Sequence, residues 1–556
     1  MKNMILLTMM LASATLFAQE WQWVGSAGGQ YQDGGEIVDV DPDGNIVICG
    51  KFIGTVWFDT TSIVSHGDQD IFIAKYDSSG TFLWAQGAGG PNTDESVSVA
   101  FDQQGNVVFT GYFKQSAVFG TTTITGNNDL EFFVAKYGPD GTFQWVKKAT
   151  GPGNDRGKGI DTDTKGNVLV TGSYRDTCFF GTTTLISPGD DNVFLAKYSP
   201  IGTLLWVVDG GGPFQAWTST VSTDANDNAY ITGSFKNSAQ FGTHTVTSYG
   251  GNDVLLAKAD SSGNWLWAVN AGGTMDDYGN GMEVDVFGNI AVTGSFFDTV
   301  VFAPAPYIVS YGSKDGFIAY YDANGNGLWA NAMGGAQSDK GIACSTDKDG
   351  YVYVTGFVNG IAYFGSATDT GYGGDDIFLA KYDQNGNLLY ETLAGSTGND
   401  YGKGIQVDDQ GVAYVTGTFM NTTHFGNIAI QSAGDRDIFL AKYYDGVPLL
   451  IQQPVSKEVC SNDMVNLTLQ ASGPGTMSYQ WFYETNPISG AVLDNYSFVA
   501  SAVGNSGKYY CQVTNAYGTV TSDTAVINIY PLPDINFSAA DSAWFFDTIN
   551  ICIDPG

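Results

Sequence analysis

The stretch Asp376–Tyr390, which reads DIFLAKYDQNGNLLY, decides the fold because close copies of it recur along most of the chain. The copies read DIFIAKYDSSGTFLW at Asp70–Trp84, NVFLAKYSPIGTLLW at Asn192–Trp206 and DVLLAKADSSGNWLW at Asp253–Trp267. The closing aromatic residue falls at Trp23, Trp84, Trp145, Trp206, Trp267, Trp329 and Tyr390. Each step is 61 residues except the one of 62 between Trp267 and Trp329. A fixed period of this length indicates one supersecondary unit repeated seven times.

Each repeat has the pattern of short antiparallel strands. In the second repeat, apolar and polar residues alternate over 96–101 and 106–112, around a turn at Asp102–Gly105. Further strands are expected over 121–125 and 131–137, and no segment shows sustained helical periodicity. Four or five strands in each of seven repeats predict an all-β fold, a seven-bladed β-propeller.

The phase of the repeat predicts how the ring closes. The segment Trp21–Gly25 (WQWVG) matches the last strand of a repeat, whereas the end of the seventh repeat has decayed to VPLLI at Val447–Ile451. We therefore expect the N-terminal strand to complete the last blade, which would hydrogen-bond an otherwise open edge.

Several motifs recur in register: GGxxxDxG, DxxGNVxVTGSF, FGTTT and DIFLAKYDxxGxLW. Together they resemble the seven-bladed bacterial β-propeller repeat family over about residues 21–450. The resemblance implies a propeller domain at 19–450, with repeats of about 61 residues. The tail DxxGxLW also resembles the repeats of quinoprotein propellers, which implies that its Trp docks between blades.

A second domain is expected at 451–532, where the composition changes. Cys460, Trp481, Tyr509 and Cys511 follow the linker Gln452–Pro454, and this pattern resembles an immunoglobulin-like β-sandwich. The resemblance implies a Cys460–Cys511 disulfide, a core Trp481 and a tyrosine corner at Tyr509. Residues 533–556 are interpreted as the start of a further, truncated domain. This modular order resembles that of exported proteins of the Bacteroidota.

Charge and the N-terminus indicate export. The 556-residue chain has 23 Lys and Arg against 57 Asp and Glu, a net charge of −34, which excludes nucleic acid binding as a main role. Residues 1–18 are interpreted as a signal peptide, with Lys2 before an apolar run at Met4–Leu11 that is too short to span a bilayer. No later segment is expected to cross a membrane. The mature protein is predicted to be secreted or on the cell surface, and monomeric.

The sequence shows no catalytic constellation, so a non-enzymatic protein is expected. The three histidines, His66, His244 and His424, occupy non-matching positions of different repeats. The string GPGNDRGKG at Gly151–Gly159 has Pro152 and Gly159 where a phosphate-binding loop needs Gly and Ser or Thr. We interpret it as a landmark of the repeat.

Acidic residues recur at two positions of the repeat, and their main predicted role is to hold turns through backbone N–H groups. One position is acidic in all repeats except at Ala216, and the other in all except at Asn192. No cofactor is expected on this interpretation. The alternative is calcium, for which Asp39, Asp41 and Asp43 form the best local string of oxygen ligands.

The function favoured by the sequence is binding or adhesion. The propeller would be a rigid platform for an unknown glycan, protein or surface ligand, with the immunoglobulin-like domain as a spacer. Trp217 is the candidate ligand contact, because the fourth repeat replaces the usual acidic stretch with FQAW at Phe214–Trp217. Alternatives are an extracellular propeller enzyme (a polysaccharide lyase or a quinoprotein-like oxidoreductase) and a purely structural envelope or matrix protein.

Overall fold

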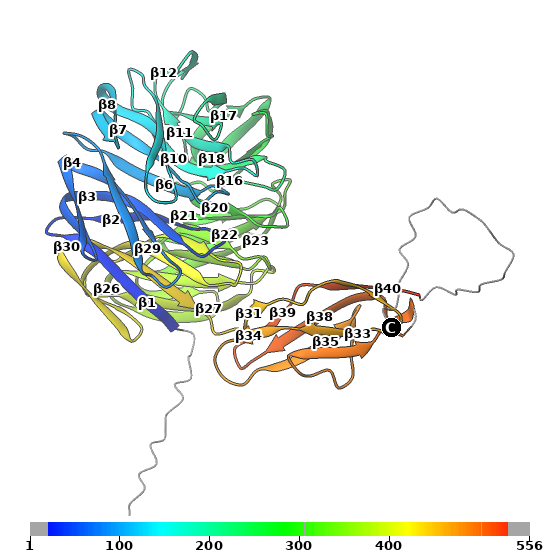
Figure 1. Cartoon of the computed structure of the whole chain (residues 1–556). Coiled ribbons are helices and arrows are strands. Elements are labelled where there is room, and N and C mark those ends of the chain that lie inside the picture. The colour runs from blue at the N-terminus through cyan, green and yellow to red at the C-terminus, as the bar shows by residue number, and fades with distance from the viewer. Residues whose placement is uncertain (1–19, 305–306, 502, 532–556) are drawn as a thin grey trace, which may run out of the picture. The chain divides into compact units, whose positions relative to one another are not determined.

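The computed structural model describes residues 20–304, 307–501 and 503–531. The predicted signal peptide at 1–18 and the predicted further domain at 533–556 lie outside the described residues. The chain divides into two compact regions, Trp21–Tyr443 and a second that contains the chain from Tyr444 onward (Figure 1). Both consist of β-strands, and the described residues contain no α-helix, so the expected all-β class is confirmed.

The strands of the first region form antiparallel groups of four that follow the sequence repeats. From the inner to the outer strand, the first three repeats contain β2 (Gly34–Val40), β3 (Ile46–Phe58), β4 (Thr61–Tyr76), β5 (Phe82–Ala88); β6 (Glu95–Phe101), β7 (Val107–Phe119), β8 (Thr122–Tyr137), β9 (Phe143–Ala149); and β10 (Arg156–Thr162), β11 (Val168–Tyr174), β14 (Asn192–Tyr198), β15 (Leu204–Gly210). The third repeat also carries the short hairpin β12 (Thr177–Phe180) and β13 (Thr183–Ile186).

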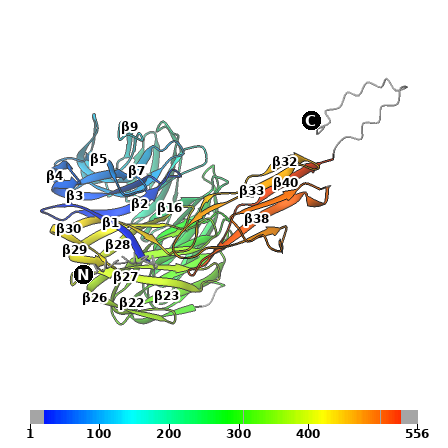
Figure 2. The ribbon, with the colours of Figure 1, turned by 60° about the horizontal axis from the view of Figure 1, so that its bottom comes forward.

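The later repeats have the same order. They contain β16 (Ala216–Thr223), β17 (Ala229–Phe241), β18 (His244–Ala259), β19 (Trp265–Ala271); β20 (Tyr278–Val284), β21 (Ile290–Val301), β22 (Tyr307–Tyr321), β23 (Gly327–Gly335); β24 (Lys340–Thr346), β25 (Val352–Phe364), β26 (Ala367–Tyr382), β27 (Leu388–Gly395); and β28 (Tyr401–Val407), β29 (Ala413–Phe425), β30 (Ile428–Tyr444). The outer partner of β30 is β1 (Glu20–Gly29), from the other end of the chain (Figure 2).

The second and third strands are longer than the sequence predicts. In the second repeat, β7 and β8 continue to Phe119 and Thr122, so the segment predicted as a separate strand over 121–125 is the start of β8. The register shifts between Lys114 and Ser116, where Gln115 has φ of 61°. This irregularity bends the hairpin without ending it, and each group therefore has four main strands.

Neighbouring repeats meet in two ways. The inner strands contact one another in the order β2, β6, β10, β16, β20, β24, β28 and again β2. At the outer edge, the end of each fourth strand pairs with the second-strand extension of the next repeat, as in Gly334↔Tyr363 and the isolated bridge Gly89↔Val118. The same contact joins β1 to β3 of the first repeat, through Gly28↔Trp57.

The hydrophobic core lies between repeats. One cluster joins Val47 and Ile71 of the first repeat to Phe109 and Phe133 of the second, and all four side chains are fully buried or nearly so. Another joins the sixth and seventh repeats and includes Trp21 of β1. Each sheet buries both faces, and burying one such aromatic or aliphatic side chain contributes roughly 1.5–3 kcal/mol.

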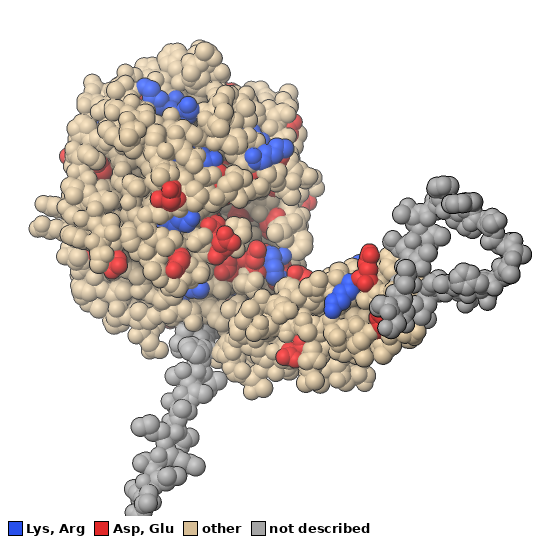
Figure 3. Space-filling view, viewed as in Figure 1, with Lys and Arg blue, Asp and Glu red and all other residues tan. Residues whose placement is uncertain are grey.

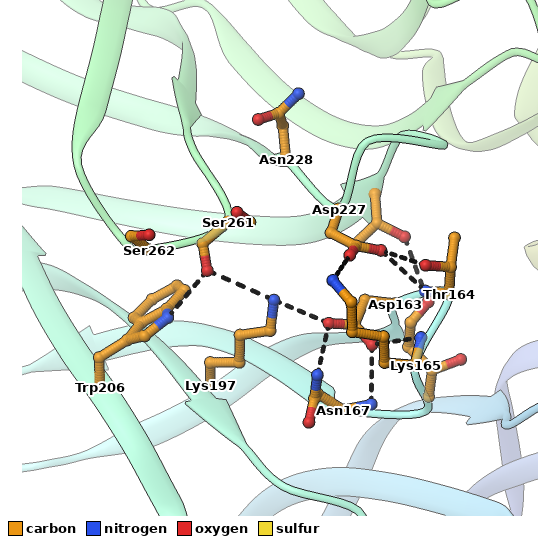
Figure 4. A network of polar contacts seen from close by, with 12 residues as sticks. Asp163, Thr164, Lys165, Asn167, Lys197, Trp206, Asp227, Asn228, Ser261 and Ser262 are labelled. Carbon is orange, nitrogen blue, oxygen red and sulfur yellow. Dashed lines mark hydrogen bonds and ion pairs between the residues drawn. The ribbon is translucent and has the colours of Figure 1, made fainter.

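The recurring Trp docks on the next repeat, as the resemblance implies. The indole N–H of Trp84, Trp145 and Trp206 donates to a carbonyl 55 residues further on, over 3.0–3.2 Å. In Figure 4, Trp206 and Lys197 both donate to the carbonyl oxygen of Ser261. Lys197 also forms a buried ion pair of 2.7 Å with Asp163, whose carboxylate caps its own turn through the N–H groups of Lys165 and Asn167. The AK and DxxGN motifs are therefore structural.

The second region contains one six-stranded sheet and two pairs of short strands. Its largest sheet has the order β32 (Lys457–Cys460), β40 (Ala525–Tyr530), β38 (Gly507–Thr514), β35 (Ser478–Tyr483), β36 (Asn486–Pro487), with β39 (Thr519–Thr521) beside β38. Two further pairs are β33 (Met464–Thr468) with β37 (Asn495–Val499) and β31 (Leu449–Gln452) with β34 (Gln470–Ser472). A single 3₁₀ turn, η1, covers Val503–Asn505.

Trp481 and Tyr509 lie in the core of the second region. The Trp481 side chain is fully buried and its indole N–H donates to the Leu493 carbonyl over 2.9 Å. The Tyr509 hydroxyl donates to the carbonyl of Asn505, four residues upstream, over 2.9 Å.

The predicted Cys460–Cys511 disulfide is wrong, because Cys511 is a buried free thiol. Cys460 lies in β32 and Cys511 in β38, two strands of one sheet with β40 between them. Strands are about 4.8 Å apart, so the Cα atoms are further apart than the roughly 7 Å that a disulfide can span. Leu467 of β33 and Trp481 share the apolar cluster that contains Cys511.

Candidate functional site

A cavity of about 440 Å³ lies between the inner strands of the first region. Every one of β2, β6, β10, β16, β20, β24 and β28 contributes side chains to its lining. Because these strands contact but do not pair with one another, they leave an axial space, which we call the channel. Its size falls within the range of small-molecule sites, roughly 300–1,000 Å³.

The channel has a distinct mouth where the inner strands begin. At this level Arg156, Tyr278, Lys340 and Tyr401 are the first residues of β10, β20, β24 and β28, and Trp217 is the second residue of β16. All five side chains are half-buried. The mouth therefore combines aromatic rings with cationic groups.

Trp217, the candidate ligand contact, lines the channel. Its ring stacks against Tyr278, with 6.1 Å between ring centroids and an interplanar angle of 24°. The Tyr278 side chain comes from the next repeat, so the pair bridges the fourth and fifth repeats. A half-buried aromatic pair beside a polar cavity can bind the flat face of a ligand.

Charged side chains gather at the mouth, although charged residues are only 14% of the chain. Lys403 forms an ion pair of 2.6 Å with Glu36, and Lys51 pairs with Glu95 at 3.2 Å. Lys158 projects over the Tyr112 ring, 6.0 Å from its centroid. On the face shown in Figure 3, most of the surface is formed by uncharged residues, and Asp and Glu side chains gather near its centre.

Three carboxyl groups lie deeper, about three strand residues or roughly 10 Å from the mouth. Asp39, Asp161 and Glu283 line the channel. Burial raises their pKa values to about 7, 6 and 8, and for Glu283 repulsion from Asp39 and Asp161 adds to this effect. Asp39 accepts from the Phe101 N–H over 2.7 Å and Asp161 from the Thr223 N–H over 2.7 Å. These bonds join unpaired inner strands, so they are structural.

The three calcium candidates do not converge. Asp39 faces the channel, whereas Asp41 caps its turn through the Asp43 and Asn45 N–H groups and lies 3.9 Å from Lys75. Asp43 is exposed in the same turn. Within the described part of the chain, no group of three or more His, Cys, Asp and Glu side chains is arranged to hold a metal ion.

The acids that recur in the repeat hold backbone N–H groups, as predicted. Asp94 accepts from Gly90 over 2.7 Å and from Lys114 over 2.9 Å, and Asp315 accepts from the Tyr311 N–H over 2.5 Å. These acids also meet in pairs between repeats. Burial, together with the partner carboxyl, raises the pKa of Asp94 beside Asp70 and of Asp315 beside Asp339 to about 7. Asn192 and Ala216 replace both acids at the contact of the third and fourth repeats.

The structure does not bring the histidines together. His66 lies in β4, His244 begins β18 and His424 lies in β29, each in a different repeat. His66 contacts the Asp70 carboxylate at 3.2 Å, and this aspartate belongs to one of the acid pairs.

Sequence reasoning missed the cationic side chains of the mouth. Lys158 and Lys403 stand three residues after the recurring acids Asp155 and Asp400, and Arg156 and Lys340 stand one residue after Asp155 and Asp339. Aligning the repeats on these acids would have shown basic residues at inward-facing strand positions. The string GPGNDRGKG contains two of them, so it is part of the mouth as well as a landmark of the repeat.

Comparison with known proteins agrees with the repeat architecture. Residues 144–173 match the family model "Beta-propeller repeat". The chain is 24% identical to an uncharacterized WD repeat-containing protein, L264, of Acanthamoeba polyphaga mimivirus over 78% of its length and 39% of that protein. It is 29% identical to the regulatory protein FlaEY of Caulobacter vibrioides over 38% of its length and 24% of that protein. The chain is thus a propeller-repeat protein that spans well under half of these relatives.

Among solved structures, titin M4 matches 16% of the chain at 18% identity, and the extracellular domains 3–5 of Drosophila OTK match 56% at 13% identity. The matched regions span 99% of the titin M4 chain and 93% of the OTK chain. The TM-score is 0.15 in each case, which is too low to support an argument. No helix in the described residues has the length and apolar character needed to cross a membrane.

Proposed function

We propose that this chain is a secreted or cell-surface binding protein whose propeller holds a ligand at the mouth of the channel. A rigid ring of seven blades would present the mouth, and the second region would be an immunoglobulin-like spacer. The signal-like N-terminus and the net charge of −34 support export and solubility outside the cell.

The ring of seven blades is supported by the cyclic order of the contacts. The inner strand of the last repeat, β28, contacts β2 of the first. The outer strand β1 lies beside β30 and also pairs with β3, so both ends of the region share one edge. An immunoglobulin-like second region is supported by the buried Trp481 and by the Tyr509–Asn505 hydrogen bond.

The observation that carries the proposal is Trp217, which lines the channel and stacks against Tyr278 of the next repeat. Trp217 interrupts the repeat, and Ala216 before it occupies the usual acid position, so this blade contact lacks the carboxyl pair of the others. A ligand site on a repetitive scaffold requires residues that differ from the repeat, and Trp217 is such a residue.

The test is binding of the labelled full chain to a glycan array and to bacterial cell-wall and extracellular-matrix preparations. We expect binding, and we expect Trp217→Ala to weaken it at least tenfold while Trp217→Phe retains more of it. Trp57, with 52% of its surface exposed in β3 away from the channel, provides the control Trp57→Ala. Binding that is unchanged in Trp217→Ala, or no binding to any surface, would contradict the proposal.

A further inference from the structure

The mouth of the channel carries more positive than negative side chains, in a protein with the opposite overall charge. We define the cationic mouth as Lys51, Arg156, Lys158, Lys340 and Lys403. All five are half-buried, and Lys158, Lys340 and Lys403 line the cavity directly. They come from the first, third, sixth and seventh repeats and surround the opening.

The neighbouring acids neutralise only part of this charge. Glu36 pairs with Lys403 at 2.6 Å and with Lys51 at 3.7 Å, and Glu95 pairs with Lys51 at 3.2 Å. In the part of the chain that the structure describes, no carboxylate lies within ion-pair distance of Arg156, Lys158 or Lys340. These three cationic groups therefore form no direct ion pair, although Glu95 and Glu36 attract Lys158 from a longer distance.

Keeping cations half-buried without a direct ion pair costs free energy. The pKa of Lys340 falls to about 8, because the group is buried and because Lys314 and Lys403 repel its charge. Burial also lowers the pKa of Lys158. A negatively charged ligand would offset both the desolvation and the mutual repulsion, since it would form direct ion pairs with these groups.

Aromatic and cationic groups share one rim of this opening. Arg156, Trp217, Tyr278 and Lys340 all lie at the start of inner strands of consecutive repeats, from the third to the sixth. A sugar ring can stack on an indole while an acidic substituent reaches a neighbouring ammonium or guanidinium group. The cavity of about 440 Å³ has the size of a small-molecule site, so it is large enough for a small saccharide.

We propose that the cationic mouth binds an acidic saccharide, a sugar carrying a carboxylate or sulfate group, with its ring against Trp217. This inference rests on the proposed function, and it adds the charge and chemical class of the ligand. The acid group lies among Arg156, Lys158 and Lys340.

The experiment is isothermal titration calorimetry of the full chain with five probes. They are trigalacturonate, its neutral methyl ester, a sulfated chondroitin disaccharide, a tetraglutamate peptide and sodium sulfate. Lys158→Gln and Lys340→Gln remove one charge each at similar size. Lys236, an exposed lysine of β17 outside the channel lining, provides the control Lys236→Gln.

An acidic sugar should bind at least tenfold more tightly than the methyl ester, and the uronate and sulfate arms identify which acid is preferred. Each channel variant should weaken it fivefold or more, whereas Lys236→Gln should not. Wild-type affinity should also fall with added salt, a result that does not depend on how the variants fold. Equal binding of acid and ester would overturn the acidic-ligand inference but leave the proposed function intact. Equal or tighter binding of peptide or sulfate, or no sugar binding, would also overturn it, and the surface-binding screen then decides the proposed function separately.

Discussion

At the scale of single residues, the repeat is held together by indole rings that lie on glycines. A Cβ atom at Gly141 would stand 2.9 Å from the ring of Trp84, and Gly141 has φ of 80°. Both facts require glycine in the turn Pro139–Gly141, because a side chain would be strained and would also push the indole away. The same arrangement places Trp145 on Gly202 and Trp329 on Gly386. The Trp at the end of each repeat therefore packs on a glycine turn of the next repeat, in addition to being part of a strand.

Gly141→Ala should therefore lower the free energy of unfolding by about 2–4 kcal/mol, with roughly half of the loss due to backbone strain. The matched control is Gly181→Ala, because Gly181 has φ of 63° but a Cβ atom there would meet no other atom within 4 Å. Urea denaturation of both variants separates the two effects. Equal losses would show that contact with Trp84 contributes nothing.

Some residue roles could be predicted from the sequence and others could not. The docking role of the Trp residues and the core position of Trp481 follow from motifs, since the same residue types recur in the same contexts. The Cys460–Cys511 pairing failed because spacing along the chain does not say that the two strands share one sheet. The charges of the channel mouth could not be predicted, because Arg156, Lys158 and Lys340 are isolated in the sequence and come together only where the inner strands contact one another.

At the scale of elements, pairs of carboxyl groups lie where the loop after one outer strand meets the next inner strand. In the Asp315–Asp339 pair both side chains are fully buried, and the Asp315 Oδ1 atom has no hydrogen-bond donor among the described groups. A proton shared between the two acids would satisfy this atom, because two buried like charges cannot both ionise cheaply. Asn192 takes the place of such an acid in the third repeat and needs no shared proton. Its side-chain oxygen accepts from the Gly212 N–H over 3.2 Å, and its NH₂ group remains available as a donor.

These acids should make the first region less stable at alkaline pH. The folded-state pKa of Asp315 is about 7, above the ordinary value of 3.8, so the folded chain binds the extra proton. The stabilisation is complete below about pH 4 and is lost as the pH rises through 7. Asp33, Asp94, Asp155 and Asp277 have the same raised value.

Asp315→Asn should reduce this dependence, because an amide can donate at the Oδ1 position while its oxygen keeps the Tyr311 N–H. We expect the variant to be more stable than the wild type at pH 8.5 by about 1–2 kcal/mol and to show little difference at pH 5. The exposed Asp409 provides the control Asp409→Asn. Thermal melts from pH 5 to 9 give the comparison, and parallel curves for wild type and Asp315→Asn would contradict the shared proton.

Strand positions were predictable at this scale, because alternating apolar residues and DxxG turns mark them. The long hairpins were not, since β7 and β8 extend through a polar segment past Gln115 that reads as a loop. Beyond Gln115 the two strands continue to pair with each other, from Ser116↔Thr125 to Phe119↔Thr122, and the alternation of residues does not reveal this pairing.

At the scale of the whole molecule, β1 holds the two ends of the first region together. Trp21 is 5% exposed, and its ring lies 5.1 Å from Phe425 and 5.2 Å from Tyr443 of the seventh repeat. The end of β1 pairs with β3 of the first repeat at Gly28↔Trp57. The side chain of Trp21 thus packs in the last repeat, whereas the end of β1 pairs with the first repeat. The phase of the sequence repeat predicts that β1 completes the last repeat.

Trp21→Ala should destabilise the entire region by about 3–5 kcal/mol, because it leaves a large cavity at the junction. Leu83→Ala is the control, since Leu83 lies in the outer strand β5 with 48% of its surface exposed. Urea unfolding followed by circular dichroism and by limited proteolysis should show one shifted, cooperative transition. Loss of the N-terminal strand alone, with the midpoint unchanged, would show that β1 does not close the ring.

The central claim is that the channel mouth is the ligand site. A crystal structure of the full chain with trigalacturonate tests it most directly, because it locates the sugar. We expect density for a sugar ring against Trp217, with its carboxylate among Arg156, Lys158 and Lys340. A sugar bound on the outer edge of the repeats or on the second region, with the mouth empty, would contradict it.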